Sequence, residues 1–138
     1  MLNHTMIVSF DQPIPDAELD QYLKDIENQM LGSGRVETFA ARRHIRVPAD
    51  DHSPVFVASA IIQLGVADVD ALNAVFTVPG TEELIQRWQS RHPYQVVWTN
   101  HEALSPCQST TADGPDRWQG VRPAHPAARQ PSRRDVDA

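Results

Sequence analysis

Cysteine and lysine are almost absent from the sequence, which contains only Cys107 and Lys24. A single cysteine cannot form an intramolecular disulfide, and it cannot build a cysteine-based metal cluster. No apolar run approaches the roughly 18 residues that a membrane-spanning helix requires, and residues 1–5 lack the basic and apolar regions of a signal peptide. We therefore expect a cytoplasmic protein that has no membrane partner.

The common cofactor and catalytic motifs are absent as well. The sequence has no phosphate loop, no dinucleotide-binding glycine fingerprint, no His-Glu-x-x-His and no Gly-x-Ser-x-Gly. Asp50, Asp51 and His52 are metal ligands by type, but three adjacent loop residues do not readily converge on one ion. The sequence therefore predicts no metal site and no bound cofactor.

Basic side chains are scarce in the first three quarters of the chain. Residues 1–104 hold 14 acidic and 7 basic residues, a balance of −7, whereas residues 105–138 hold 4 acidic and 5 basic residues, a balance of +1. An acidic domain offers little to neutralise phosphates, so we expect no nucleic-acid partner.

The hydrophobic pattern of residues 1–104 changes between the strand period and the helix period. A stripe of apolar side chains at helical spacing runs from Leu19 to Met30, and Gly32 is placed to end that helix with a left-handed cap. Asp68 and Thr81 are each expected to cap a further helical stretch. The predicted strands are residues 6–10, 35–47, 55–65 and 94–99.

The resulting order is βαββαβ, which is typical of an α+β ferredoxin-like domain. Such a domain has a four-stranded antiparallel sheet with its helices on one face. The other face is left open, and an open apolar face is costly in water. We therefore predict a homodimer that closes the two open faces into an α+β barrel.

Residues 105–138 differ in composition from the rest of the chain. They contain five of the eleven prolines and few bulky apolar side chains apart from Trp118 and Val121. Such a segment cannot offset the entropy lost on ordering, so we predict a folded domain over residues 1–104 and a disordered tail over residues 105–138. The proline and arginine content of the tail could bind a partner, but an untied terminus is the simpler interpretation.

The alternation of the two central strands predicts a pocket on the open face. If Ile45 pairs with Phe56, then Arg42 lies opposite Ser59 and His44 opposite Val57. In that register the open face collects polar side chains among apolar ones, as small-molecule sites commonly do. The predicted site residues on these strands are Thr38, Arg42, His44, Val57, Ser59, Ile61 and Gln63.

His44 and Arg42 are the catalytic candidates of this pocket. The imidazole of a histidine exchanges a proton near neutral pH, and an arginine can stabilise a carboxylate, phenolate or enolate. In the alternative interpretation, both side chains lie in solvent at a sheet edge and balance an acidic protein. Trp98, in the last strand, is a candidate for stacking on an aromatic substrate, although a tryptophan in a strand is more often part of the core.

The element order, the length of about 100 residues and the open sheet face resemble the dimeric α+β barrel superfamily. That superfamily includes antibiotic-biosynthesis monooxygenases, muconolactone-isomerase-like proteins, small polyketide cyclases and the EthD-like group. Residues 75–88 (VFTVPGTEELIQRW) are similar in style to the broken second helix of these proteins.

The resemblance implies a homodimer with a pocket between sheet and helices in each subunit. It also implies cofactor-independent chemistry on aromatic or polyketide-like small molecules, although some members bind haem. On this basis we expect a small cyclase, isomerase or monooxygenase of secondary metabolism. The alternative is a non-catalytic binding or accessory protein of the same fold.

Overall fold

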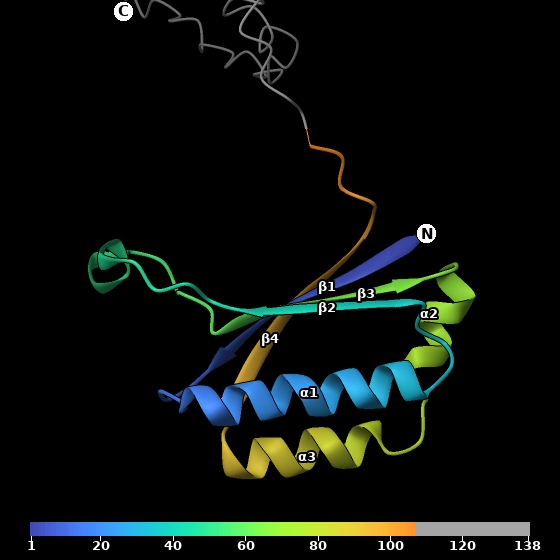
Figure 1. Ribbon diagram of the computed structural model, residues 1–138, viewed down its shortest axis with the longest axis horizontal. Coiled ribbons are helices and arrows are strands. Elements are labelled where there is room, and N and C mark those ends of the chain that lie inside the picture. The colour runs from blue at the N-terminus through green and yellow to red at the C-terminus, as the bar shows by residue number, and fades with distance from the viewer. Residues whose placement is uncertain (107–138) are drawn as a thin grey trace, which may run out of the picture. The chain divides into compact units, whose positions relative to one another are not determined.

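The computed structural model describes residues 1–106, in which a four-stranded antiparallel sheet is covered on one face by helices (Figure 1). The strand order is β2-β3-β1-β4, so β2 and β4 form the two edges. The predicted ferredoxin-like architecture is confirmed. The elements are β1 (Leu2–Phe10), α1 (Asp16–Gly32), β2 (Thr38–Arg43), a 3-10 turn η1 (Pro48–His52), β3 (Ala60–Val66), α2 (Val69–Val75), α3 (Thr81–Arg91) and β4 (Tyr94–Glu102).

The helix boundaries follow the local sequence, with two corrections. Asp68 caps α2 as predicted, because its carboxylate accepts a 2.8 Å hydrogen bond from the backbone N–H of Ala71. The N-cap of α3 is Gly80 rather than Thr81, and the left-handed residue after α1 is Gly34 rather than Gly32. Both glycines have a positive φ, a conformation that a Cβ atom opposes.

The core lies between the helices and one face of the sheet. The buried stripe of α1 consists of Leu19, Tyr22, Ile26 and Met30, as its helical spacing predicts. It packs on buried alternate residues of the central strands, Val8 of β1 and Ala60, Ile62, Leu64 and Val66 of β3. We call this side of the sheet the helix face and the opposite side the open face.

The pairing of β2 with β3 differs from the predicted register by two residues. Arg42 lies opposite Ile61 rather than Ser59, and Thr38 lies opposite Gly65 rather than Gln63. A slip of two residues keeps every side chain on its own face, so alternation cannot detect it. The slip leaves a longer connection between the strands than the sequence indicated.

That connection, residues 44–59, projects beyond the sheet and the helices as an arm (Figure 1). Its root continues the ladder by one bond, from the N–H of His44 to the carbonyl of Ser59 (2.9 Å). The arm contains η1, where the sequence predicted an irregular connector. His44, Val57 and Ser59 were predicted within strands and instead belong to the arm.

The predicted disordered tail, residues 105–138, lies almost wholly outside the described residues and stays a prediction. Within residues 1–106, no helix is long and apolar enough to cross a membrane. No group of three or more histidine, cysteine, aspartate or glutamate side chains is arranged to hold a metal ion in that part of the chain.

Candidate functional site

Two cavities on the open face bring together part of the predicted site. Arg42, His44 and Ile61 line a cavity of about 130 Å³. A larger cavity, of about 550 Å³, lies beside it and is lined by Val57. Ile7 and Ala58 line both cavities, so the two cavities adjoin each other beside β1 and the root of the arm.

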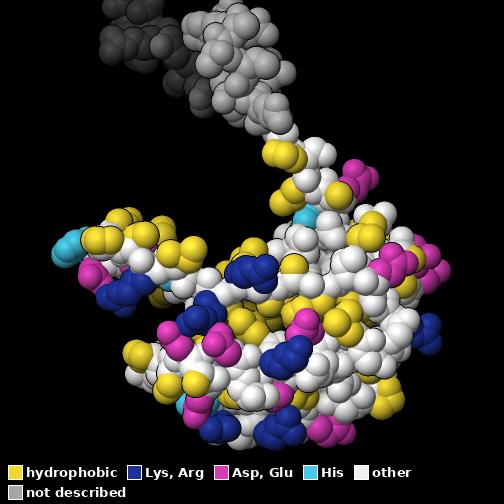
Figure 2. All heavy atoms as spheres, in the orientation of Figure 1, with side chains coloured by type: hydrophobic (Ala, Val, Ile, Leu, Met, Phe, Trp, Pro, Cys, Tyr) yellow, Lys and Arg dark blue, Asp and Glu magenta, His cyan; other side chains and the backbone are white. Residues whose placement is uncertain are grey.

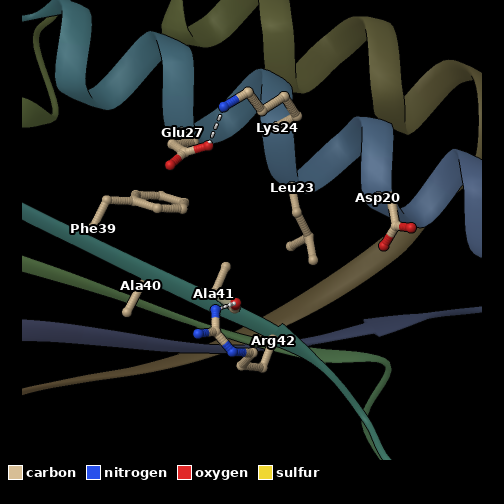
Figure 3. Close-up of a pocket in the computed structure, with 8 residues that line it drawn as sticks. All are labelled: Asp20, Leu23, Lys24, Glu27, Phe39, Ala40, Ala41 and Arg42. Atoms are coloured by element: carbon tan, nitrogen blue, oxygen red, sulfur yellow. Dashed lines mark hydrogen bonds and ion pairs between the residues drawn. The ribbon is translucent and has the colours of Figure 1, made fainter.

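The side chain of Arg42 is exposed on the open face in a single chain. Its guanidinium donates a 2.7 Å hydrogen bond to the carbonyl of Ala41 on the same strand. Figure 3 shows this side chain on the side of β2 that faces away from α1. Its other donors are free of any protein acceptor within residues 1–106, so the proposed role in substrate binding stays a prediction.

His44 is engaged by a carboxylate of the arm. Its Nε2 donates a 2.7 Å hydrogen bond to Asp50, which also accepts one from the N–H of Val47. The bond from His44, followed by the one from Val47, lowers the pKa of the Asp50 carboxyl. This hydrogen bond connects the first residue of the arm to the 3-10 turn η1. The imidazole of His44 therefore has a structural role, and its catalytic role stays a prediction.

Gln63 belongs to a relay of hydrogen bonds that is satisfied within the chain. Gln63 donates to the hydroxyl of Thr5 (3.0 Å), which donates to Nε2 of His101 (2.7 Å). His101 in turn donates from Nδ1 to the carbonyl of Glu102 (2.6 Å). Each member of the relay therefore has at least one hydrogen-bond partner within the chain.

Thr38 and Ser59 have local structural contacts. The hydroxyl of Thr38 occupies the space above Gly65, where any Cβ would overlap with it. Ser59 accepts a 3.0 Å hydrogen bond from the N–H of Phe10 through its hydroxyl, and it thereby ties the arm to β1. Neither residue lies with Arg42 in the small cavity.

Trp98 lies apart from the other predicted site residues. It pairs with Met6 in the ladder and faces the helix side of the sheet. There its ring lies 5.7 Å from that of Phe76, at the end of α2, and 5.3 Å from the imidazole of His4. Trp98 is 59% exposed and Phe76 is 50% exposed, so the two rings form a half-open aromatic cover over His4.

His4 is the functional candidate that the sequence interpretation missed, because the first strand was predicted over residues 6–10, whereas β1 begins at Leu2. The side chain is 1% exposed and occupies a position of the helix face, between Leu64 of β3 and Asn100 of β4. The signal was available in the alternation of β1, where Leu2, His4, Met6 and Val8 share one face. A histidine in such an apolar row is costly unless it is hydrogen-bonded.

Asn100 provides that hydrogen bond and orients the ring. Nδ1 of His4 lies 2.7 Å from Oδ1 of Asn100, so Nδ1 carries the proton in the neutral imidazole. Nε2 then holds a lone pair and is free to accept a proton. The edge of Phe76 packs against the ring at 5.4 Å and fixes its plane. His4 therefore combines a defined tautomer with a partly open aromatic surface.

A third hollow, of about 210 Å³, lies between α1 and β2 (Figure 3). Leu23 and Phe39 both extend into the space between α1 and β2 and give it an apolar lining (Figure 3). Figure 2 shows hydrophobic side chains exposed between these two elements. Lys24 and Glu27 on its rim pair with each other at 2.7 Å. Asp20, which also lines the groove, pairs with Arg43 at 3.0 Å, so the charged side chains of α1 at this groove are engaged in ion pairs.

Comparisons with known proteins identify the fold. No protein-family model matches the chain, and no curated protein matches it. A DABB family protein with a ferredoxin-like fold from Mesorhizobium loti superposes with a TM-score of 0.58 at 15% identity, covering 75% of this chain and 97% of that chain. A hydroxynitrile lyase from Passiflora edulis gives a TM-score of 0.59 at 12% identity, covering 78% and 96%.

A third structure, a dimeric ferredoxin-like protein of unknown function from Thermobifida fusca, gives a TM-score of 0.58 at 8% identity and covers 74% of this chain and 90% of that chain. Identities this low establish a common fold and leave the chemistry open. Structures of this fold include an enzyme and a dimeric protein. This chain therefore has the ferredoxin-like α+β fold that its sequence predicted and that these solved structures share.

Proposed function

We propose that the protein is a small cofactor-independent enzyme that transfers a proton to or from an aromatic small molecule, with His4 as the acid–base group. The observation that carries this proposal is the burial of His4 in an apolar row beneath a half-open aromatic pair. A histidine is an unusual choice for an apolar row, and departures from the local pattern concentrate at functional sites.

The surroundings of His4 suggest the substrate class. Trp98 and Phe76 offer ring faces on which an aromatic substrate can stack, at a point from which its reacting group can reach the imidazole. A basic Nε2 suits the removal of a proton from a hydroxyl group or from a carbon beside a carbonyl. Cyclisation, isomerisation and cofactor-free oxygenation of aromatic or polyketide-like molecules each begin with such a step.

Asn100 would act as a positioning residue in this reaction. By accepting a hydrogen bond from the Nδ1–H group, Asn100 keeps the lone pair of the neutral ring at Nε2, and it stabilises the imidazolium that forms when Nε2 takes up the substrate proton. Loss of this acceptor should lower kcat more than it raises KM.

A second proposal concerns assembly. A homodimer is supported by the exposed apolar side chains Ile7, Ile61 and Val97 on the open face and by the dimeric protein of the same fold. Arg42 and His44 would then border the dimer interface beside the two cavities, where an anionic substrate group could still reach them.

The experiment uses 2-indanone, an aromatic ketone with exchangeable protons, in deuterated buffer. NMR would follow the loss of its methylene proton signals with catalytic amounts of the full chain. We expect exchange well above the buffer rate for the wild type, loss of that excess in His4→Gln, and a wild-type rate in His52→Gln. His52 is the matched control because it is an exposed histidine on the arm, away from His4.

Two outcomes would count against an enzyme. If wild-type protein binds 2-indanone, with shifts of the His4 imidazole signals, but does not accelerate exchange, the non-catalytic binding protein is favoured. If His4→Gln and the wild type accelerate exchange equally, His4 is not the acid–base group.

A further inference from the structure

The arm, residues 44–59, exposes large apolar side chains along most of its length. Phe56 is fully exposed, Ile45 is 81% exposed and Val55 is 70% exposed, and Val47 and Val57 are also exposed. Figure 2 shows hydrophobic side chains gathered over the projecting arm. An exposed apolar surface of this kind on a protruding element is typical of an interaction site.

The arm is held in shape by polar contacts of its own. His44 bonds Asp50, and Arg46 forms an ion pair with Asp51 at the 3-10 turn. Ser59 anchors the root to β1 through its backbone N–H and its hydroxyl. The apolar side chains of the arm therefore take little part in fixing its conformation, and they remain available to another surface.

The apolar side of the arm is continuous with the open face of the sheet. Phe56, Val57 and Ala58 line the same 550 Å³ cavity as Ile7 and Val97. In the ladder Ile7 lies between Ile61 and Val97, and all three are exposed. We refer to these three residues as the apolar strip. One partner that lies across the open face would cover the strip and the arm together.

A second copy of this chain fits that surface. In a twofold dimer each patch meets its own symmetry mate, so the arm of one copy can cover the apolar strip of the other while the reverse contact forms simultaneously. In the neighbouring relay the hydroxyl of Thr5 and both ring nitrogens of His101 already have partners within the chain, so a second copy can cover these groups without stranding them. The dimeric ferredoxin-like protein from Thermobifida fusca, which has the same fold, also favours a second copy as the occupant.

We propose that the arm is the clasp of a homodimer: its apolar side chains lie on the open face of a second copy, and the dimer does not form without them. This assigns the dimer interface to residues 44–59 as well as to the sheet. The proposal is independent of the chemistry at His4, which lies on the opposite face of the sheet.

The first experiment removes the arm from the full chain. Residues 45–58 are replaced by Asn-Gly, because His44 and Ser59 are opposite each other in the ladder and a two-residue turn can join them. Sedimentation equilibrium would compare the dimer dissociation constants of the two proteins. We expect the wild type to dimerise at micromolar concentration and the variant to show a dissociation constant raised by about 100-fold or more.

A point-substituted chain tests the same idea without shortening the backbone. In Val55→Ser/Phe56→Ser the arm keeps its polar contacts and loses two exposed apolar side chains, and we expect the same weakening of the dimer. Val69→Ser is the matched control, since Val69 is 62% exposed but lies at the start of α2, on the helix face.

Four results would decide the matter. Weakened dimerisation in Val55→Ser/Phe56→Ser with an unaffected Val69→Ser supports the clasp. An unchanged dissociation constant in Val55→Ser/Phe56→Ser or in the armless chain overturns it, as does equal weakening by Val69→Ser. A wild-type chain that stays monomeric at 100-fold higher concentration also overturns it, because the second copy would then not be the occupant.

Discussion

Replacing His4 by leucine tests whether this histidine serves the stability of the fold or the proposed proton transfer. Leucine fills a similar volume, and the site is an apolar row between Leu64 and the aromatic pair. The substitution removes the hydrogen bond to Asn100, which contributes about 0.5–1.5 kcal/mol. Asn100 is exposed, so its amide can bond water instead and no buried acceptor is stranded.

The burial of the leucine side chain should offset the loss of the hydrogen bond to Asn100. Full burial of a leucine side chain stabilises a protein by about 1.5–3 kcal/mol, and part of that gain replaces the burial of the imidazole. We therefore expect the free energy of unfolding of His4→Leu to be unchanged or raised by about 1 kcal/mol, which corresponds to about 4 °C in Tm for a domain of this size. Exchange of 2-indanone protons should fall to the buffer rate.

The assays are urea denaturation, thermal unfolding and proton exchange on the same protein samples. His4→Ala is the comparison for volume, since it opens a cavity and should lower the free energy of unfolding by about 2–4 kcal/mol. A His4→Leu protein that is destabilised by more than about 2 kcal/mol, yet exchanges 2-indanone protons at the wild-type rate, would refute the reasoning. The histidine would then be a structural residue.

Three further predictions concern the candidate pocket and the ionisable groups. Arg42→Ala and His44→Ala should leave the free energy of unfolding within about 1 kcal/mol of wild type. In calorimetry, both substitutions should weaken binding of benzoate, an aromatic carboxylate, by about 1.5–3 kcal/mol. A large loss of stability with unchanged binding would make both residues structural. The hydrogen bond from His92 lowers the pKa of the half-buried Glu18 carboxyl. The stabilising effect of this carboxylate is therefore present above the ordinary glutamate pKa and is lost as pH falls through the folded value. Glu18→Gln should flatten the fall in Tm between pH 5 and 3, and an unaltered acid profile would contradict this. Burial raises the pKa of the Tyr22 hydroxyl, so the folded state favours its neutral form. The stability of the fold should therefore fall once pH rises above the ordinary tyrosine pKa. Tyr22→Phe should reduce the loss of Tm above pH 10, and an identical alkaline profile would show that Tyr22 is not the source of that loss.

Periodicity in the sequence was sufficient for the elements and the fold. The helical stripe of α1 and the alternation of β3 depend only on which positions are apolar, because each element must bury one side against the same core. The cap at Asp68 followed from local chemistry as well. With these elements in the order βαββαβ, few topologies remain, and the ferredoxin-like sheet is the one observed.

The register and the arm were decided by tertiary structure. Pairings of Arg42 with Ser59 or with Ile61 put the same side chains on the same faces, so the sequence pattern is identical for both. The observed register is selected by contacts distant in sequence, such as the bond from the N–H of Ser59 to Val8 on β1 and the fit of Thr38 over Gly65.

The candidate site likewise depends on pairing between distant strands. The sequence by itself predicted a tryptophan in the last strand, whereas the first predicted strand, residues 6–10, left out His4. Only the sheet brings His4, Asn100 and Trp98 together, because β1 and β4 are about 90 residues apart along the chain and their ladder fixes which side chains share a face. The burial that orients His4 arises from that pairing and from the packing of Phe76, neither of which a local pattern encodes.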